Sequence, residues 1–511
     1  MDRPRIGELL RDEGPLGGSL AVVLLAAAWV ATWRPQVDPD AWWHLAIGES
    51  IVTIGTIPST EPFSWLSAGA PFVAHSWLWD VLLAGAWRAG GATGTSLLAV
   101  PVTALVVWLT WKLIGLAAPS LPPLGRATLV LVCVIAALPV WAPRAQTLDV
   151  AFVLATILVL ARYLRLGDRR GLVVLPVLGV LWANLHGSAI LALPGCVALA
   201  VLALPIGTRW QAWPRRAVSP IVLAGLAGVA ATVLNPYGVT LLTYPFDRDV
   251  ASAFSPAIVE WRPPDLGAVE LLPLRVLLAG LVVVAVWYPA RSRDPFLLLA
   301  ATAWTFAALG SVRFLAIAAP LLVVAIAPAV GSAVAHWAGV AGKTDEARAD
   351  GAPATDLRRG PAAAIAAVAV AGILLAGWLI VDPARQDAAI GRRLPVAAVS
   401  ALDAGGCTAR LLPSYGWAGY VIWSSGRQVA AYGNSAEGAV TDQAQLEALA
   451  IDPRPWLDDH AVGAVLMPAR GPLSRWLDEA GEWRVAYRDG QAAVHVRSAT
   501  TDCSVSLPPG P

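Results

Sequence analysis

Charged residues are scarce in this sequence. Asp, Glu, Lys and Arg together make up 14% of its 511 residues, whereas hydrophobic residues make up 57%. A soluble domain carries about 25% charged residues, so this composition excludes an ordinary soluble protein. The formal net charge is +1 and no basic patch stands out, which argues against nucleic acid as a partner. The sequence therefore predicts a polytopic α-helical membrane protein whose main solvent is the lipid bilayer.

Cysteine is rare as well, and its four residues divide by location. Cys133 and Cys196 lie in apolar runs, where a cysteine behaves as a small buried hydrophobe. Cys407 and Cys503 lie in a polar C-terminal region that the topology below places outside the cytoplasm, where a disulfide can persist. We therefore expect Cys407 and Cys503 to pair.

The N-terminus lacks the features of a secretory signal. Residues 1–16 lack the small-residue cleavage site of a secretory signal. We therefore expect the first apolar run to stay in place as an anchor, with residues 1–16 in the cytoplasm.

Long apolar runs are abundant, and they define a membrane domain over residues 17–381. Eleven of these runs are long enough to span a bilayer when tilts and breaks are allowed: 17–33, 93–118, 126–142, 148–164, 171–184, 188–205, 218–235, 269–288, 295–310, 313–333 and 362–381. A further segment, 76–91, carries Asp80 and Arg88 and ends in Gly90-Gly91. It is expected to be re-entrant or interfacial, the alternative being a full crossing there and a partial segment elsewhere. The sequence thus predicts about 11–13 membrane segments.

Basic residues in the short loops predict the orientation of these segments. Arg and Lys cluster in the loops near residues 165–170, 209–216, 291–293 and 338–361, which are therefore expected in the cytoplasm. The loops between them are nearly free of basic residues. This alternation places the loop 34–75 and the polar region 385–511 outside, in a multi-pass protein of the plasma membrane.

The polar region 385–511 is expected to form a small α/β domain. Short apolar runs at 420–423, 464–466 and 492–496 are typical of strands, and residues 442–451 and 473–482 are typical of helices. The cytoplasmic loop at 339–360 is rich in Ala, Asp, Arg and Gly and is expected to be flexible.

Two carboxylates, two tryptophans and a histidine lie together in the stretch 38–49, just after the first apolar run. Asp40 and His44 have i, i+4 spacing, and Trp43 and Ile47 repeat it, which indicates a short amphipathic helix. We expect this helix to lie in the membrane interface with its tryptophans at headgroup depth. The alternative is a surface loop with anchoring aromatic residues.

Polar residues gather at the outer ends of the segments. They are Asp38, Asp40, His44, His75, Arg144, Asp149, Asn184, His186, Asn235, Tyr237, Glu260 and Arg313. Together they are expected to form a polar cleft just above the hydrocarbon, which suits a reaction on a lipid headgroup better than passage across the bilayer. Asp80, inside an apolar run, is expected to face the same cleft, because an unpaired carboxylate there costs several kcal/mol.

Other roles remain open for four of these residues. Arg144 and Arg313 can simply extend to lipid headgroups instead of binding a lipid phosphate. Asn184 and Asn235 can cap helix ends, most readily Asn235 because a proline follows it.

The histidines also have alternatives. His186 can be an interfacial histidine with an internal partner. Asp40 and His44 can be metal ligands at their helical spacing. Two ligands do not define a metal site, so a divalent cation stays an open alternative and no other cofactor is indicated.

Several motifs resemble a known superfamily. The aspartate and the Gly55-Thr56-Ile57-Pro58 turn after a first spanning segment are similar to the first exterior loop of GT-C membrane glycosyltransferases, which use polyprenyl-phosphate-linked sugars and include protein O-mannosyltransferases and the lipid A aminoarabinose transferase. A bacterial group of GT-C-like proteins resembles the chain more fully. Its motifs match residues 38–48 (Asp-Pro-Asp-x-Trp-Trp-His-Leu-x-x-Gly), 62–65, 75–78, 182–187, 235–238 and 415–420.

This resemblance implies specific roles. Asp40 is the matching general base, with Asp38 as the fallback, and it would deprotonate an acceptor hydroxyl that attacks the anomeric carbon opposite the lipid phosphate. Arg144 or Arg313 would stabilise the departing phosphate. Asp149 lies where some GT-C enzymes place a second acidic residue. The region 385–511 would bind or position the acceptor, although its signature is weaker because residues 431–434 replace the usual acidic-Gly-Arg run.

The resemblance thus implies an inverting glycosyltransferase that moves a sugar from a polyprenyl-phosphate donor to an envelope glycan, lipid or protein. One rival is a transporter of envelope lipids, which would show charges at mid-bilayer and inverted repeats. Another is a non-catalytic scaffold, for which Asp40 would be dispensable.

Overall fold

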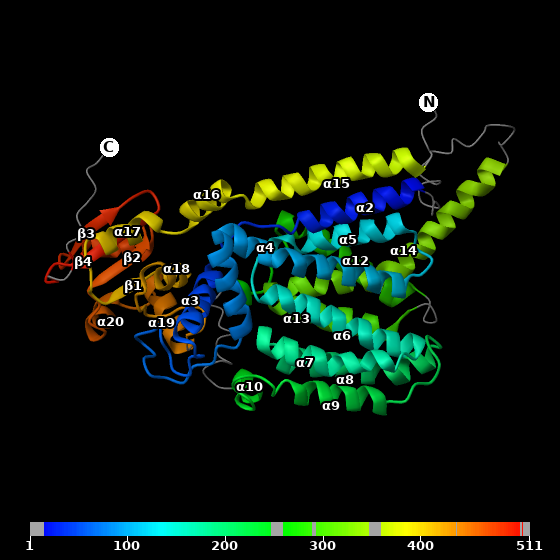
Figure 1. Cartoon of the computed structure of the whole chain (residues 1–511), viewed down its shortest axis with the longest axis horizontal. Helices are drawn as coiled ribbons and strands as arrows, with labels where there is room; N and C mark the ends of the chain where they lie inside the picture. Colours follow the sequence, from blue (N-terminus) through cyan, green and yellow to red (C-terminus); the bar gives the residue numbers. More distant parts are fainter. Residues whose placement is uncertain are drawn as a thin grey trace.

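The computed structural model describes residues 15–246, 259–288, 293–346, 359–435, 437–500 and Cys503. The molecule is elongated, with a body of long helices at one end and a small domain with a sheet at the other (Figure 1). Most helices of the body run along the long axis, and the polypeptide enters the small domain only after the last of them, α15 (Arg359–Val381). The chain thus has the two parts that the sequence predicts, a helical membrane body and a C-terminal α/β domain.

The helices of the body correspond one by one to the predicted apolar segments. Besides α15 they are α2 (Pro15–Val30), α4 (Trp77–Ala117), α5 (Pro123–Ala137), α6 (Gln146–Leu166), α7 (Val174–Leu185), α8 (Ala189–Arg209), α9 (Ser219–Ala231), α12 (Leu272–Trp287), α13 (Pro295–Gly310) and α14 (Leu315–Glu346). In the described residues, seven helices are long and apolar enough to cross a membrane, and four more apolar helices are shorter.

Helix α4 combines two of the predicted segments. Gly90 and Gly91 have non-helical dihedral angles, and Gly91 has a φ of 56°. Only glycine adopts such a φ at little cost, so this pair breaks the helix between the segments 76–91 and 93–118. The break falls where the sequence ends the shorter segment.

The helix predicted at residues 38–49 exists, as α3 (Pro39–Ile54), and it is covered by protein. Trp42 and Trp43 are 1% and 5% exposed, because α3 is enclosed between α4 and α18 (Tyr415–Ser425) of the C-terminal domain. These tryptophans therefore contact protein, and their headgroup depth stays a prediction. The spacing of the residues predicted the helix. It could not predict the element that covers its second face, because that element lies almost 400 residues away in the sequence.

The C-terminal domain contains one four-stranded sheet. Its strands are β1 (Leu411–Pro413), β2 (Ala464–Pro468), β3 (Trp483–Arg488) and β4 (Ala492–Arg497), in the order β1-β2-β4-β3. β1 and β2 are parallel, and the other two pairings are antiparallel. Around the sheet lie α16 (Pro383–Arg393), α17 (Val396–Ala404), α19 (Glu437–Glu447), α20 (Pro453–Asp459) and α21 (Pro472–Glu479).

Two predictions for the C-terminal half need correction. Residues 420–423 were expected to be a strand but lie inside α18, because a short buried apolar run fits either structure. The expected flexible loop at 339–360 begins too early, since α14 continues to Glu346, and residues 347–358 lie outside the described residues. Cys407 and Cys503 form a disulfide, and Cys133 and Cys196 are free and buried.

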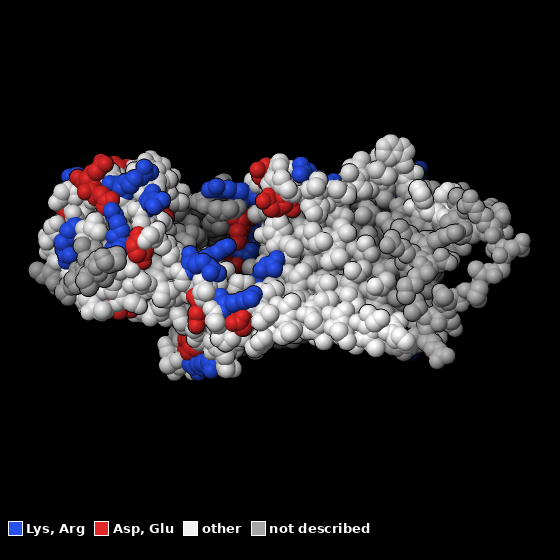
Figure 2. Space-filling model, turned by 90° about the horizontal axis from the view of Figure 1, so that it is seen from above, with Lys and Arg blue, Asp and Glu red and all other residues white. Residues whose placement is uncertain are grey.

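Charge is distributed very unevenly over the surface. Figure 2 shows Lys, Arg, Asp and Glu over the C-terminal domain and the adjoining end of the helical body, with a hollow between them that holds side chains of both signs. On the face shown, the described surface of the body farther from that domain is almost free of charge. An uncharged belt of this kind is what a bilayer requires, so the hollow lies at a polar end of the membrane body.

We predict that Gly48→Ala destabilises the protein, because α3 crosses α4 at Gly48. A Cβ there would lie 1.9 Å from the carbonyl oxygen of Asp80 and 3.0 Å from Cβ of Ala84. Forcing the helices apart costs about 1–3 kcal/mol, which thermal unfolding of the full chain in detergent would show as a lower Tm. Gly85→Ala on α4, where nothing lies within 4 Å, is the matched control. Equal Tm values for the two variants would contradict this packing.

Candidate active site

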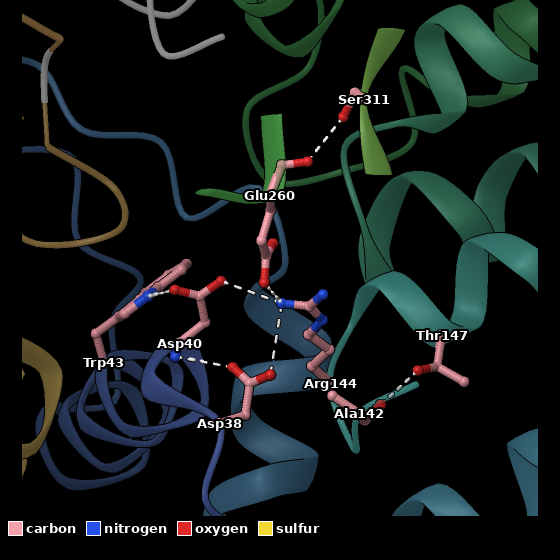
Figure 3. A network of polar contacts seen from close by, with 8 residues as sticks. All are labelled: Asp38, Asp40, Trp43, Ala142, Arg144, Thr147, Glu260 and Ser311. Atoms are coloured by element: carbon pink, nitrogen blue, oxygen red, sulfur yellow. Dashed lines mark hydrogen bonds and ion pairs between the residues drawn. The ribbon is translucent and has the colours of Figure 1, made fainter. Parts of the chain in front are cut away.

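Arg144 lies at the centre of a cluster of three carboxylates (Figure 3). Its Nη1 is 3.4 Å from Oδ2 of Asp38 and 3.8 Å from Oδ2 of Asp40, and it also donates a hydrogen bond to Oε1 of Glu260. The side chain of Arg144 is 7% exposed. These residues come from three distant parts of the chain, and they meet at the polar end of the body.

The local sequence Asp-Pro-Asp places two of the carboxylates. Asp38 is the N-cap of α3, and its Oδ1 accepts a hydrogen bond from the backbone N–H of Asp40 at 2.9 Å. Pro39 takes the first helical position, where its missing N–H is not needed. Asp40 in the first turn is favoured by the positive end of the helix dipole. Both carboxylates are therefore fixed at the start of α3.

The environments of the two aspartates differ. The side chain of Asp38 is 8% exposed, whereas that of Asp40 is 31% exposed. Burial raises the pKa of Asp38 to about 6; the negative charges of Asp40 and Glu260 add to this rise, and the charge of Arg144 opposes it. Asp38 is thus a buried capping group, and Asp40 is the carboxylate that a ligand in the cleft can reach.

A hydrogen bond links the segments that carry Glu260 and Arg313. Glu260 belongs to the turn η5 (Val259–Trp261), and its carbonyl accepts a hydrogen bond from the hydroxyl of Ser311 at 2.9 Å. Arg313 lies in the turn η8 (Val312–Phe314), with its guanidinium 4.2 Å from the ring centroid of Trp261. Within the part of the chain that the structure describes, Arg313 forms no ion pair with a carboxylate. A cation of this kind can accept an anionic ligand.

A pocket lies between Arg144 and Arg313. Its polar lining comes from these arginines and from Gln146, Thr147 and Asp149 in the first turn of α6. The rest of its lining is apolar and comprises Val140, Trp141, Val150, Phe314, Ala316 and Ile317. The start of a long helix and Arg313 favour an anion, and the apolar wall favours a hydrocarbon chain.

A second polar group lies beside the carboxylate cluster. Nδ1 of His44 is 2.6 Å from Oδ1 of Asp80, and both side chains are 1% exposed. Asp80 therefore has the partner that its burial requires, and this partner comes from α3. His44 pairs with Asp80 through Nδ1 and stacks on Trp43 with ring centroids 3.6 Å apart. Metal ligation by Asp40 and His44 stays an open alternative. The described residues contain no group of three or more His, Cys, Asp or Glu that could hold a metal ion.

Asp149 is the centre of a third group. It accepts hydrogen bonds from the Ser188 hydroxyl at 2.6 Å and from Nε1 of Trp182 at 2.9 Å, and Nδ1 of His186 lies 2.9 Å from its Oδ2. The ring of His75 is 5.5 Å from that of His186. The structure thus shows the alternative in which His186 has a partner within the protein, Asp149.

The remaining predicted site residues form hydrogen bonds within the protein. Asn184 accepts a hydrogen bond from Nε1 of Trp77 at 3.0 Å. The side chain of Asn235 accepts from the backbone N–H of Tyr237 at 2.7 Å, as expected for a turn before proline. The hydroxyl of Tyr237 donates to the carbonyl of Pro58 in the first long loop. These side chains are occupied by contacts within the protein.

Some residues at the site were not predicted from the sequence. Trp43 donates from Nε1 to Oδ1 of Asp40 at 3.3 Å, and the spacing of i, i+3 between them was the available signal. Ser188 follows the predicted motif by one residue. Gly433 of the C-terminal domain approaches both Trp43 and Asp40, and no sequence signal connects it to them.

No protein-family model and no curated protein matches the sequence. Solved structures with a similar fold do exist. The oligosaccharyltransferase AglB from Archaeoglobus fulgidus, in complex with an inhibitory peptide and a dolichol-phosphate, aligns with a TM-score of 0.58 at 12% identity, over 88% of this chain and 69% of AglB. ArnT from Cupriavidus metallidurans, bound to undecaprenyl phosphate, aligns with a TM-score of 0.50 at 14% identity, over 96% of this chain and 98% of ArnT.

Both neighbours are members of the GT-C superfamily, and at such identities the likeness reports the fold. The chain therefore has the fold of the GT-C membrane glycosyltransferases.

Proposed function

We propose that this protein is an inverting glycosyltransferase. It would move a sugar from a polyprenyl-phosphate donor to an envelope glycan, lipid or protein at the outer face of the plasma membrane. The observation that carries the proposal is the accessible carboxylate of Asp40, fixed at the start of α3 next to Arg144 and the pocket of Arg313. The lipid phosphates named for AglB and ArnT support a donor of this class.

Asp40 is the better base of the two aspartates. Asp38 is buried, and one of its oxygens is committed to capping α3. Asp40 is more exposed and makes longer contacts, at 3.8 Å to Arg144 and 3.3 Å to Trp43. A general base must reach the proton of its substrate, so accessibility favours Asp40. Asp38 then acts by holding the helix start and Arg144 in place.

Arg313 is the better cation for the donor phosphate. Arg144 already faces three carboxylates, whose combined charge would repel a phosphate. Arg313 has no carboxylate partner among the described residues, and it lines the pocket with the apolar wall. A phosphate bound there would leave the polyprenyl chain against Phe314 and Ile317 and the sugar toward Asp40.

The reaction that follows is a single displacement. The acceptor hydroxyl oxygen attacks the anomeric carbon while Asp40 takes its proton, and a new glycosidic C–O bond forms. The bond between the anomeric carbon and the phosphate oxygen breaks, and the polyprenyl phosphate leaves with the electron pair. Arg313 stabilises the charge that develops on the leaving oxygen. Attack from the face opposite the phosphate inverts the anomeric configuration.

The distribution of charge favours this proposal over a transporter. A transporter of envelope lipids needs polar groups at mid-bilayer, whereas the charges visible in Figure 2 gather at one end of the body and over the C-terminal domain. A site at one end suits chemistry on a headgroup. Arg165 in the last turn of α6, and Arg169 and Arg170 after it, lie at the opposite end of a helix about 30 Å long. The positive-inside rule therefore supports an outward-facing site and C-terminal domain.

We predict that Asp40→Asn abolishes sugar transfer. The amide keeps the shape of the carboxylate but cannot take a proton, so the rate should fall at least 100-fold. Membranes that carry the native or variant chain are supplied with a pool of radiolabelled polyprenyl-phosphate sugars, and label is counted in envelope material. Asp387→Asn, at an exposed position on α16, is the matched control. Equal labelling by Asp40→Asn and native protein would support the scaffold alternative.

We predict opposite effects of pH on activity and on stability through Asp38. As the pH falls through about 6, Asp38 is protonated, Arg144 pairs more tightly with Asp40, and transfer declines. Because the folded-state pKa lies above the usual 3.8, this group's contribution to stability is present below 3.8 and is lost as the pH rises through about 6. Asp38→Asn should remove both dependences, which transfer rates and Tm between about pH 5 and pH 8 would show. Unchanged profiles in the variant would contradict this role.

We predict that Arg313→Gln weakens donor binding. Loss of the cation should raise the KM for the lipid-linked donor at least 10-fold, because a hydrogen bond to a charged group contributes about 1.5–3 kcal/mol and about 1.4 kcal/mol corresponds to a tenfold change. The measurement is the donor dependence of transfer, together with binding of a polyprenyl phosphate to the purified chain. Arg385→Gln, at an exposed site on α16, serves as the control. Native affinity in Arg313→Gln would place the phosphate elsewhere.

A further inference from the structure

Among the described residues, one side chain donates a hydrogen bond to the proposed base. Apart from its distant contact with Arg144, the carboxylate of Asp40 is held by Nε1 of Trp43, which donates to Oδ1 at 3.3 Å. Trp43 lies one turn farther along α3, so the indole reaches back over Asp40 (Figure 3). The position of the indole therefore determines which way the carboxylate faces.

One face of the indole is fixed from within the membrane body. It stacks on the imidazole of His44, with ring centroids 3.6 Å apart and an interplanar angle of 28°. His44 is held in turn by Asp80 of α4. Because both partners are almost fully buried, the imidazole has little freedom to turn, and the indole rests on a rigid support.

The C-terminal domain packs closely against the indole nitrogen of Trp43. A Cβ built on Gly433 would lie 2.3 Å from Nε1 of Trp43 and 3.1 Å from Oδ1 of Asp40. Gly433 is not among the glycines with positive φ, so its backbone conformation does not require glycine. Close approach of its backbone to the hydrogen bond between Trp43 and Asp40 is what requires it.

The segment that carries Gly433 is itself tied to the first long loop. The hydroxyl of Tyr432 lies 3.1 Å from both carboxylate oxygens of Glu61. The Ser64 hydroxyl donates to the carbonyl of Ala430 at 2.5 Å. Gly433 is therefore held against Trp43 by neighbouring buried contacts and does not depend on a free loop.

A second close approach joins the same two parts of the chain. On α18, a Cβ at Gly419 would lie 2.9 Å from the carbonyl oxygen of Pro39 and 2.9 Å from the backbone nitrogen of Trp43. The C-terminal domain thus contacts the first turn of α3 at its backbone as well as at the indole.

We propose that the C-terminal domain completes the active site by fixing the orientation of Asp40, with Trp43 and Gly433 as positioning residues. This inference rests on the proposed function. The indole lies between His44 and Gly433, and its N–H holds the base toward the acceptor. The site is then incomplete unless the C-terminal domain is docked on α3, which gives that domain a part in the chemical step besides any contact with acceptor.

The test is a double-mutant cycle of Gly433→Ala and Trp43→Phe, measured as sugar transfer by the full chain. Each single variant should lower kcat about 10- to 100-fold and leave the donor KM unchanged, because a misplaced base affects the chemical step and not donor binding. The double variant should be no slower than the slower single variant. The added methyl group acts by displacing Nε1, and phenylalanine has no Nε1 to displace. Gly438→Ala on α19, where nothing lies within 4 Å, is the control for Gly433.

Three outcomes are distinct. If the native protein transfers sugar and Asp40→Asn does not, the proposed function is established independently of the double-mutant cycle. Native kcat in Gly433→Ala or in Trp43→Phe would then overturn the positioning role alone. Additive losses in the double variant, or a fall in Tm with a raised KM, would show that the two residues act separately on folding or binding and would also overturn it.

Discussion

The interaction on which this structure depends is the contact of one arginine with three carboxylates. Arg144 reaches Asp38 and Asp40 at the start of α3 and Glu260 in the turn η5. Like charges this close repel each other in a poorly solvated site, so the two aspartates and Glu260 can remain together only with a cation between them. The same contact leaves Arg313 as the cation without a carboxylate partner among the described residues. The pairing of Arg144 with the carboxylates thus separates Asp40, which takes a proton, from Arg313, which binds an anion.

The second constraint is that α3 belongs to both parts of the chain. It packs on α4 through Gly48 and on α18 through Gly419, and the residues between these contacts include Trp42, Trp43 and His44. Close packing on both sides makes the start of the helix rigid, which suits a site that must hold a carboxylate in one orientation. It also explains why tryptophans typical of a membrane interface are buried here, since they fill the junction between the two parts.

Much of the membrane body could be predicted because apolar length is a strong signal. All eleven predicted segments correspond to helices, and Gly90-Gly91 marked the break in α4. Residues 420–423 were assigned wrongly because four buried apolar residues fit a strand as well as a helix. The sequence could place the polar residues at one end of the body. It could not show that His44 pairs with Asp80, because side-chain partners depend on how distant helices pack.

The central claim is that Asp40 and Arg313 face the two ends of one lipid-linked sugar. A structure of the full chain with a bound polyprenyl phosphate tests this most directly. The account predicts the phosphate within hydrogen-bonding distance of Arg313, the hydrocarbon chain against Phe314 and Ile317, and Asp40 across the space left for the sugar. A phosphate bound away from Arg313, or on the same side as Asp40 with no room for a sugar between them, would contradict it.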